Sequence, residues 1–233
     1  MKNKQIKSNN NLIIHFFFLC LFFLHLASIY KDWASIQMLT KPLICLSLLI
    51  SLATSKNLNT NYQKLIAIGL FFGLLGDVFL MFKDLFILGL IAFLLGHVCY
   101  ILAFLIQKSK NSILKDIPSI ILLVLLLTYS YYFYTVLSPS LGSLKIPVII
   151  YIIGISSMCY FAFQRSVKRS TINFLLGFLG SLLFIISDSV LALNKFVAYI
   201  PSSGLVIMST YMLAQYFIFS TALFKTTSVP PSK

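Results

Sequence analysis

The chain has 233 residues, of which 59% are hydrophobic, and its mean hydropathy is +0.96. Soluble domains contain about 45–50% apolar residues, so this composition excludes a soluble protein and indicates an integral membrane protein. The 18 lysines and arginines outnumber the five acidic residues, but they lie between apolar runs rather than in one patch, so membrane topology explains the charge better than nucleic-acid binding.

Apolar runs long enough to cross a bilayer occur eight times along the chain. A spanning helix needs about 20 mostly apolar residues at about 1.5 Å of rise per residue. We therefore predict an all-α polytopic membrane protein with eight transmembrane helices, forming a single domain over residues 1–233 with cytoplasmic tails at 1–11 and 225–233. The predicted helices cover residues 12–30, 35–54, 65–82, 86–106, 117–137, 147–163, 172–193 and 204–224.

Basic residues separate the two sides of the predicted bundle. Most fall on one side, and only Lys31, Lys83, Lys145 and Lys195 fall on the other. By the positive-inside rule both termini are cytoplasmic. We expect a multi-pass protein of the bacterial cytoplasmic membrane, whose partner is the lipid bilayer and not a nucleic acid.

A weak internal repeat suggests two halves of four helices each. Gly, Asp and Tyr residues coincide when the chain is shifted by 111 residues, including both aspartates inside apolar runs. The matching pairs are Gly69 with Gly180, Asp77 with Asp188, Leu80 with Leu191 and Tyr100 with Tyr211.

Acidic chemistry rests on five aspartates, because the chain contains no glutamate. Asp32, Asp84 and Asp116 each follow a lysine at a helix end, which is typical of solvated interfacial charges. Asp77 and Asp188 instead lie inside the third and seventh apolar runs, each five residues before the end of its run. Both helices run outward, so we expect the two carboxyls at one depth, about 7–8 Å below the outer boundary.

An ionisable residue at the centre of a spanning helix costs about 2.5–3.5 kcal/mol, so two at matched depth indicate a functional site rather than helix packing alone. Two carboxyls close together in a low dielectric cannot both ionise cheaply. One can then act as a general acid and the other as a base or cation stabiliser. This arrangement suits acid-assisted hydrolysis through a carbocation-like transition state, proteolysis by an activated water, or coupled proton transport.

Other polar residues near this depth are candidates to support the pair. Lys41, beside Pro42 in the second run, either extends to the interface or belongs to a buried site. The four cysteines are isolated, so the sequence predicts no metal site. The remaining candidates are His97, Tyr100, Ser187, Ser189 and Tyr211.

Three segments carry a resemblance to a known family. GLLGDVFLMF, GLIAFLLGHVCYI and GSLLFIISDSVLALNKF, together with TKPL, resemble the YhhN family of eight-helix membrane proteins, which includes the lysoplasmalogenases. The resemblance implies hydrolysis of the vinyl ether bond of a lysophospholipid, lysoplasmalogen, without a metal or organic cofactor. The products would be a fatty aldehyde and glycerophosphoethanolamine or glycerophosphocholine.

This chemistry gives each candidate residue an expected role. One aspartic acid protonates the β-carbon of the vinyl ether, and the other carboxylate stabilises the oxocarbenium ion and orients water. Ser187 and Ser189 are potential donors that would keep Asp188 ionised. Lys41 is expected to bind the headgroup phosphate, and Tyr100, Tyr211 or His97 to position water or the ether oxygen.

Two alternatives remain open from the sequence. A proton-coupled transporter or channel could use the aspartate pair as a relay, but broken helices in matching positions of both halves are not evident. An intramembrane aspartyl protease would carry YD and GxGD motifs on consecutive helices, whereas GLLGD and ISD lie four helices apart. A phosphotransferase signature of clustered Lys, Arg and His is absent from the sequence.

Overall fold

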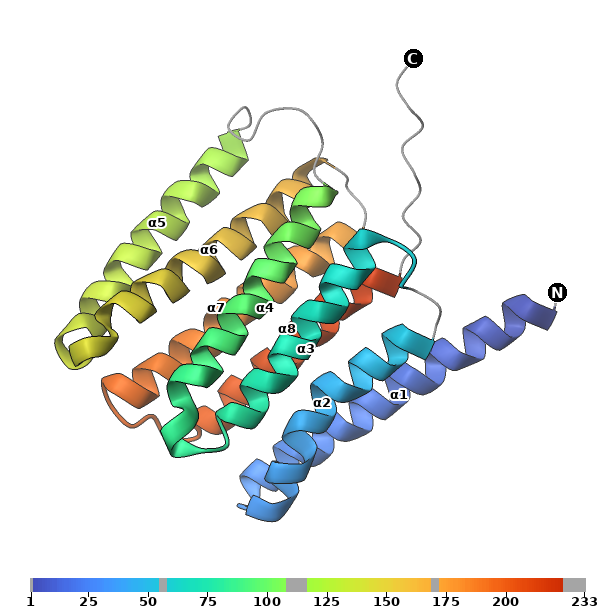
Figure 1. Ribbon diagram of the computed structural model, residues 1–233, viewed down its shortest axis with the longest axis horizontal. Coiled ribbons are helices and arrows are strands. Elements are labelled where there is room, and N and C mark those ends of the chain that lie inside the picture. Colours follow the sequence, from blue (N-terminus) through green and yellow to red (C-terminus); the bar gives the residue numbers. More distant parts are fainter. Residues whose placement is uncertain (1, 55–57, 108–116, 169–171, 224–233) are drawn as a thin grey trace.

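A computed structural model describes residues 2–54, 58–107, 117–168 and 172–223 of the chain. Throughout these residues the secondary structure is helical, and eight helices are long and apolar enough to cross a membrane, which confirms the predicted fold class (Figure 1). Short 3₁₀ turns lie before α4 and between α5 and α6. The helices are α1 (Lys2–Tyr30), α2 (Ala34–Thr54), α3 (Asn61–Phe79), α4 (Phe86–Ile106), α5 (Ile117–Leu137), α6 (Lys145–Lys168), α7 (Ile172–Phe196) and α8 (Ser203–Leu223).

The bounds of α3 differ most from the prediction. Thr60 starts the helix early, because its hydroxyl accepts from the Gln63 amide while the Gln63 side chain accepts from the Thr60 amide. The helix ends at Phe79, although the chain stays apolar beyond it. Asp77 therefore lies two residues before the end of α3, and Asp188 lies eight residues before the end of α7. The two aspartates therefore do not lie at equal distances from the ends of their helices, although they lie five residues from the ends of their apolar runs. The difference arises because hydropathy does not detect where a helix ends within an apolar stretch.

The tail predicted at residues 1–11 is also different in form. From Lys2 onward it is a continuation of α1, which projects beyond the other helices (Figure 1). The second tail, 225–233, lies outside the described residues, as does Asp116. Asp32 and Asp84 are exposed in the turns after α1 and before α4, as expected for interfacial charges.

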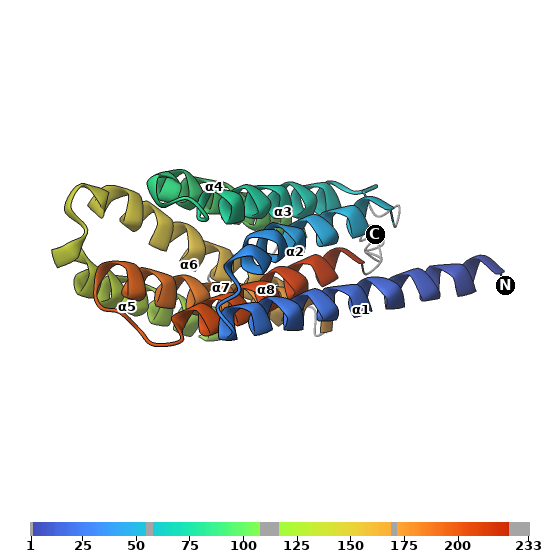
Figure 2. The same ribbon diagram turned by 90° about the horizontal axis from the view of Figure 1, so that it is seen from below.

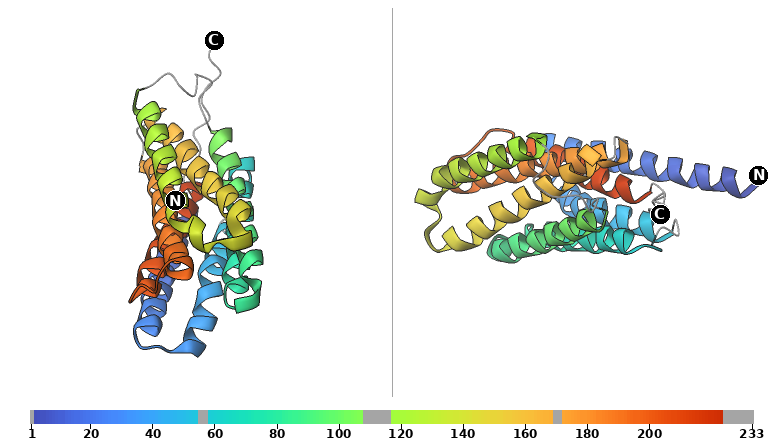
Figure 3. Two further views of the ribbon diagram at one scale, coloured as in Figure 1. Left: turned by 90° about the vertical axis from the view of Figure 1, so that its left-hand side faces the viewer. Right: turned by 90° about the horizontal axis from the view of Figure 1, so that it is seen from above.

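The helices form two layers with one helix crossing between them. Figure 2 shows α2, α3 and α4 in one layer and α1, α8, α7 and α5 in the other, with α6 passing obliquely from one to the other. The same arrangement is visible from the opposite sides in Figure 3. The largest contacts join α3 to α4 and α7 to α8. The aspartates of α3 and α7 thus belong to opposite layers.

Helix pairing corresponds in part between the two predicted halves. Contacts of α1 with α2, α2 with α3 and α3 with α4 are matched by those of α5 with α6, α6 with α7 and α7 with α8. The contact between α2 and α8 is likewise matched by that between α6 and α4. This correspondence supports two four-helix halves, and the duplication itself stays a prediction.

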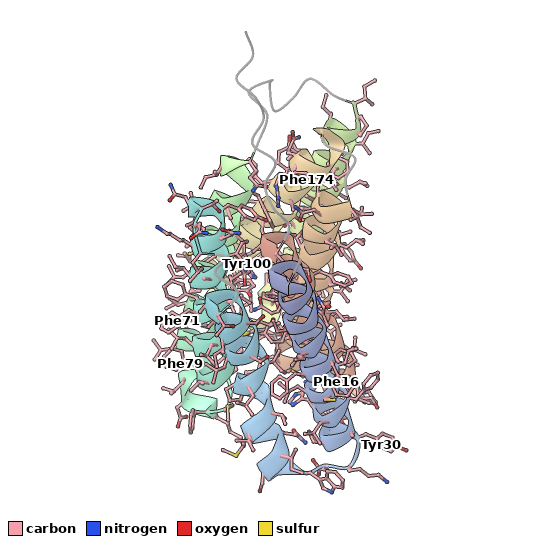
Figure 4. The ribbon with its side chains drawn as sticks, turned by 90° about the vertical axis from the view of Figure 1, so that its right-hand side faces the viewer. Phe16, Tyr30, Phe71, Phe79, Tyr100 and Phe174 are labelled. Carbon is pink, nitrogen blue, oxygen red and sulfur yellow. The ribbon has the colours of Figure 1, made fainter. Side chains whose placement is uncertain are left out.

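Large apolar side chains cover the outside of the bundle. Phe16 and Tyr30 on α1 and Phe71 on α3 are exposed and point away from the other helices, whereas Tyr100 points into the interior (Figure 4). Outward apolar residues are what a hydrocarbon solvent requires, since lipid tails are as apolar as leucine. The polar groups that matter for chemistry are therefore inside.

Arg165 is buried at the end of α6 that carries most of the basic residues. Its guanidinium donates to the Tyr62 hydroxyl at 2.8 Å and to the Gln107 side-chain oxygen at 2.5 Å. The rings of Tyr62, Phe104 and Phe174 surround it at 4.6–5.0 Å. The sequence gives no sign of this cage, which joins α3, α4, α6 and α7.

Replacing Arg165 with methionine should destabilise the protein by about 1–3 kcal/mol, because Tyr62 and Gln107 lose a charged donor in a buried site. Thermal unfolding in detergent measures this effect. The matched control is Lys195→Met, which removes an exposed cation lying 4.9 Å from the Phe86 ring. A loss for Arg165→Met no larger than that of the control would contradict a structural role for the cage.

Candidate functional site

Asp77 is enclosed by the bundle and held by a directed chain of hydrogen bonds. Its side chain is 1% exposed, and the Tyr211 hydroxyl of α8 donates to it at 2.7 Å. The Gln215 amide donates to the Tyr211 oxygen at 3.2 Å, and the Tyr100 hydroxyl of α4 donates to the Gln215 oxygen at 2.7 Å. Because each donor points along this chain, the Tyr211 proton is directed at the Asp77 carboxylate.

Close packing makes this chain of hydrogen bonds possible. Gly73 lies one turn before Asp77, and a Cβ there would come within 2.5 Å of the Gln215 amide nitrogen. Gly73 thus provides the space for Gln215, as small residues do between membrane helices. The Cys45 sulfur of α2 also lies 3.2 Å from the Tyr211 hydroxyl. Side chains from α2, α3, α4 and α8 therefore converge at Asp77.

Lys41 lies on α2 one turn before Cys45 and is partly buried. Its ammonium group attracts the Asp77 carboxylate electrostatically. Lys41 also lines a cavity of about 320 Å³, here called the polar pocket, beside His25 and Gln37. The other residues of the polar pocket are Ile29, Ala34, Met38, Leu80, Met81, Gly204 and Met208.

Asp188 has a more open environment than Asp77. It is only partly buried, and the Tyr151 hydroxyl of α6 donates to its carboxylate at 2.5 Å. Both residues line a narrow cavity of about 50 Å³, here called the apolar cavity, between α4, α5, α6 and α7. Its polar residues are Tyr129, Tyr151, Asp188 and Ser189, and its others are Leu80, Phe86, Leu90, Phe93, Phe133, Leu137, Val148, Ile152, Ile155, Ile185, Leu191, Ala192 and Phe196.

The two serines beside Asp188 do not serve it as donors. The Ser187 hydroxyl donates to the Ile207 carbonyl at 3.1 Å, and the Ser189 hydroxyl donates to the Ile185 carbonyl. Ser189 then accepts from the Tyr129 hydroxyl at 2.7 Å, since its own proton is already used. The interpretation that these serines keep Asp188 ionised is therefore wrong, because residues next to each other in a helix point in different directions.

Aromatic rings link the surroundings of the two aspartates. Phe184 contacts the Tyr211 ring at 5.6 Å and the His97 ring at 5.1 Å, and His97 contacts the Tyr151 ring at 5.3 Å. His97 is buried, and neither ring nitrogen has a hydrogen-bond partner among the described residues. Each carboxyl is held by its own tyrosine, and direct contact between the two carboxyls stays a prediction.

Tyr151 is the main site residue that the sequence analysis missed. It lies six residues after Lys145, and Asp188 lies seven residues before Lys195, so both lie at a similar distance from the lysines at their end of the bundle. Counting residues from the helix end for the tyrosines, as was done for the aspartates, would have identified Tyr151 as a residue near Asp188. Gln215 is a polar residue inside the eighth apolar run, as His97 and Tyr100 are inside the fourth, so the sequence marks it as a residue near the site without showing its partners. Cys45 offered no comparable signal, because only the rotation of α2 brings it to Tyr211.

The arrangement offers one carboxyl to a cavity and encloses the other. A carboxyl at the wall of an apolar cavity can exchange a proton with a bound molecule. The enclosed carboxyl lies in a medium of low dielectric, where a charge on it would act strongly on a neighbouring group. Among the described residues no three His, Cys or Asp side chains group as metal ligands would.

Comparison with known proteins gives a family match. The model of the YhhN family matches residues 36–222, from the start of α2 to the end of α8. The matched range includes both aspartates and leaves out α1. No curated protein and no solved structure matches the chain.

Tyr211→Phe should lower stability by about 1.5–3 kcal/mol, because the enclosed Asp77 loses its hydrogen-bond donor. Tyr151→Phe should lower stability less, because Asp188 faces a cavity that can admit a replacement water. Unfolding in detergent compares the two variants. Equal losses, or a larger loss for Tyr151→Phe, would contradict the difference in enclosure.

Proposed function

The chain belongs to the YhhN family, and from this premise we propose that it is a lysoplasmalogenase-like membrane hydrolase. It would cleave the vinyl ether bond of lysoplasmalogen, releasing a fatty aldehyde and glycerophosphoethanolamine or glycerophosphocholine. The observation that carries the proposal is a carboxyl, Asp188, on the wall of an otherwise largely apolar cavity inside a membrane bundle. Such a cavity suits a reacting group attached to a hydrocarbon chain.

The reaction needs an acid close to an alkene carbon. Asp188 donates its proton to the β-carbon, which forms a C–H bond and leaves an oxocarbenium ion at the neighbouring carbon. A water molecule adds its oxygen to that carbon and gives up a proton to the Asp188 carboxylate. The resulting hemiacetal loses the glycerol oxygen as an alcohol and becomes the aldehyde. One water is consumed, and Asp188 ends protonated as it began.

Asp77 then takes the role of a fixed anion. The Tyr211 hydroxyl donates to Asp77, and an accepting, ionised carboxylate fits this geometry. An enclosed negative charge stabilises the positive charge of the oxocarbenium ion through a low dielectric. Among the described residues Tyr151 is the one donor to Asp188, which faces the cavity, and this suits the acid. This division of roles reverses the one expected from the neighbouring serines.

The remaining candidates support these two carboxyls. Lys41, on the wall of the polar pocket, is proposed to bind the headgroup phosphate. Tyr100 and Tyr211 are engaged in the hydrogen-bond chain to Asp77 and act by positioning it. His97 packs on Tyr151 and helps to orient the donor to Asp188. The Ser187 and Ser189 hydroxyls donate to helix carbonyls, and Ser189 also lines the apolar cavity beside Asp188, where it can contact the substrate.

A proton-coupled transporter finds less support. Pro42 lies inside α2, but residue 153, its counterpart after the 111-residue shift, is an isoleucine in the continuous helix α6. Transporters of repeated structure usually interrupt matching helices in both halves. Proton flux in proteoliposomes without aldehyde release would favour transport.

Aldehyde release from lysoplasmalogen by the purified protein tests the proposal. Asp188→Asn should reduce the rate by at least about 100-fold, because the acid is lost, and Asp77→Asn should also reduce it. The control is Asp84→Asn, which changes an exposed aspartate in a turn and should retain the native rate. The ester-linked lysophospholipid of the same length should not be hydrolysed.

Two results would contradict this proposal. If the native protein in nanodiscs releases no aldehyde from lysoplasmalogen, lysoplasmalogen is not its substrate. Native rates in both Asp77→Asn and Asp188→Asn would remove the two-aspartate mechanism while leaving a hydrolase.

A further inference from the structure

Leu80 lines both the polar pocket and the apolar cavity. We propose that Leu80 is the partition between two subsites for a single-chain phospholipid, with the phosphate headgroup in the polar pocket and the hydrocarbon in the apolar cavity. The binding part of this inference stands on the two cavities alone. Its consequence for specificity of cleavage rests on the proposed function.

The polar pocket has the chemistry of a headgroup site. Lys41 offers an ammonium group to a phosphate as a compact charge with three donors. His25 donates from Nδ1 to Thr40 at 2.6 Å, because the Thr40 hydroxyl already donates to the Ile36 carbonyl. In the described part of the chain only this nitrogen of His25 is hydrogen-bonded, which leaves Nε2 for a ligand. At about 320 Å³, the pocket can hold a headgroup together with water.

Pro42 lies in the helix that forms one wall of the same pocket. A proline has no backbone N–H, so it cannot donate to the carbonyl of Met38, four residues earlier in α2. Met38 lines the polar pocket. The polar pocket thus lies where the regular hydrogen bonding of α2 is interrupted.

The apolar cavity suits the start of a hydrocarbon chain. Its walls are leucine, isoleucine, valine, alanine and aromatic side chains, with polar groups only around Asp188. A volume of about 50 Å³ accommodates a vinyl ether or a few methylene groups and a neighbouring water, not a complete fatty chain. The rest of a long chain therefore extends toward the lipid, past helices whose outer faces are apolar.

Leu80 is held between the two subsites by α4. It caps the end of α3, one turn after Asp77, and packs on Gly89. A Cβ at Gly89 would lie 2.7 Å from a Leu80 methyl carbon, so any larger residue there must move Leu80. A lipid that crosses Leu80 has its ether linkage close to this side chain, at the boundary between headgroup and chain. The width of the passage beside Leu80 then allows a lipid with one chain to bind and excludes a lipid with two chains at that position.

Binding of a saturated alkyl-ether lysophospholipid tests the inference, because its ether bond cannot be protonated at an alkene carbon and is not cleaved. Leu80→Trp should fill the partition and weaken its binding to protein in nanodiscs by at least about 10-fold. Gly89→Ala should weaken it in the same direction by displacing Leu80. Leu88→Ala, at an exposed residue beside Gly89, is the control and should bind as the native chain does.

Headgroup recognition is tested by a second comparison with the same proteins. The native chain should bind the alkyl-ether lysophospholipid more tightly than the alkylglycerol that lacks the phosphate, and Lys41→Met should abolish this difference. Leu80→Trp should still bind the free glycerophosphate headgroup, because Lys41, His25 and Gln37, the polar residues of the polar pocket, are unchanged. Retention of the headgroup also shows that Leu80→Trp is folded.

Several outcomes would overturn the inference. Unchanged lipid binding in Leu80→Trp, or equal native affinity for the lipid with and without phosphate, would remove the two-subsite arrangement. Lipid binding by the native chain without aldehyde release from lysoplasmalogen would sustain the subsites and remove the proposed reaction. Aldehyde release at the native rate in Leu80→Trp would sustain the proposed reaction and remove the two-subsite arrangement.

Discussion

The hydrogen bond from Tyr211 to Asp77 is the interaction around which α3, α4 and α8 are organised. A carboxylate that is 1% exposed inside a membrane protein must be satisfied by the protein itself, because no water is available from the lipid. The donor is the Tyr211 hydroxyl of α8, and the hydrogen bonds of Gln215 and Tyr100 orient it. Gly73 leaves the space that Gln215 occupies. One buried charge thus fixes the relative positions of α3, α4 and α8.

Enclosure of Asp77 gives the second aspartate a different role. Asp188 also accepts from a tyrosine, but it opens onto the apolar cavity, where a bound molecule can reach it. Two carboxyls in unlike surroundings can take different roles, one as the protonated acid and the other as the anion. Two carboxyls in equivalent surroundings can differ in this way only when they share one proton. The division follows from helix packing, since α6 and α7 both line the apolar cavity at Asp188, whereas Asp77 lines neither the apolar cavity nor the polar pocket.

The sequence predicts the helices well because hydropathy measures the requirement that a bilayer imposes. It misplaces the ends of α3, because the capping box at Thr60 starts the helix among polar residues and the turn at residues 80–82 ends it within an apolar stretch. It identifies Asp77 and Asp188 because charges inside apolar runs are rare. Their partners are harder to find, because Tyr151, Gln215 and the cage around Arg165 depend on how each helix is rotated. The serines beside Asp188 show the same limit, since adjacency in sequence is not contact.

The central claim is that an acid fixed in a shaped cavity protonates the alkene carbon before water adds. The test is to cleave lysoplasmalogen in water labelled with both deuterium and ¹⁸O and to reduce the aldehyde immediately to the alcohol. Mass spectrometry then gives the label content of both products, and chiral analysis gives the configuration of the deuterated carbon. The account predicts one deuterium at the carbon next to the former carbonyl, in a single configuration, and a glycerol product without ¹⁸O. A racemic or absent deuterium label, or ¹⁸O in the glycerol product, would contradict it.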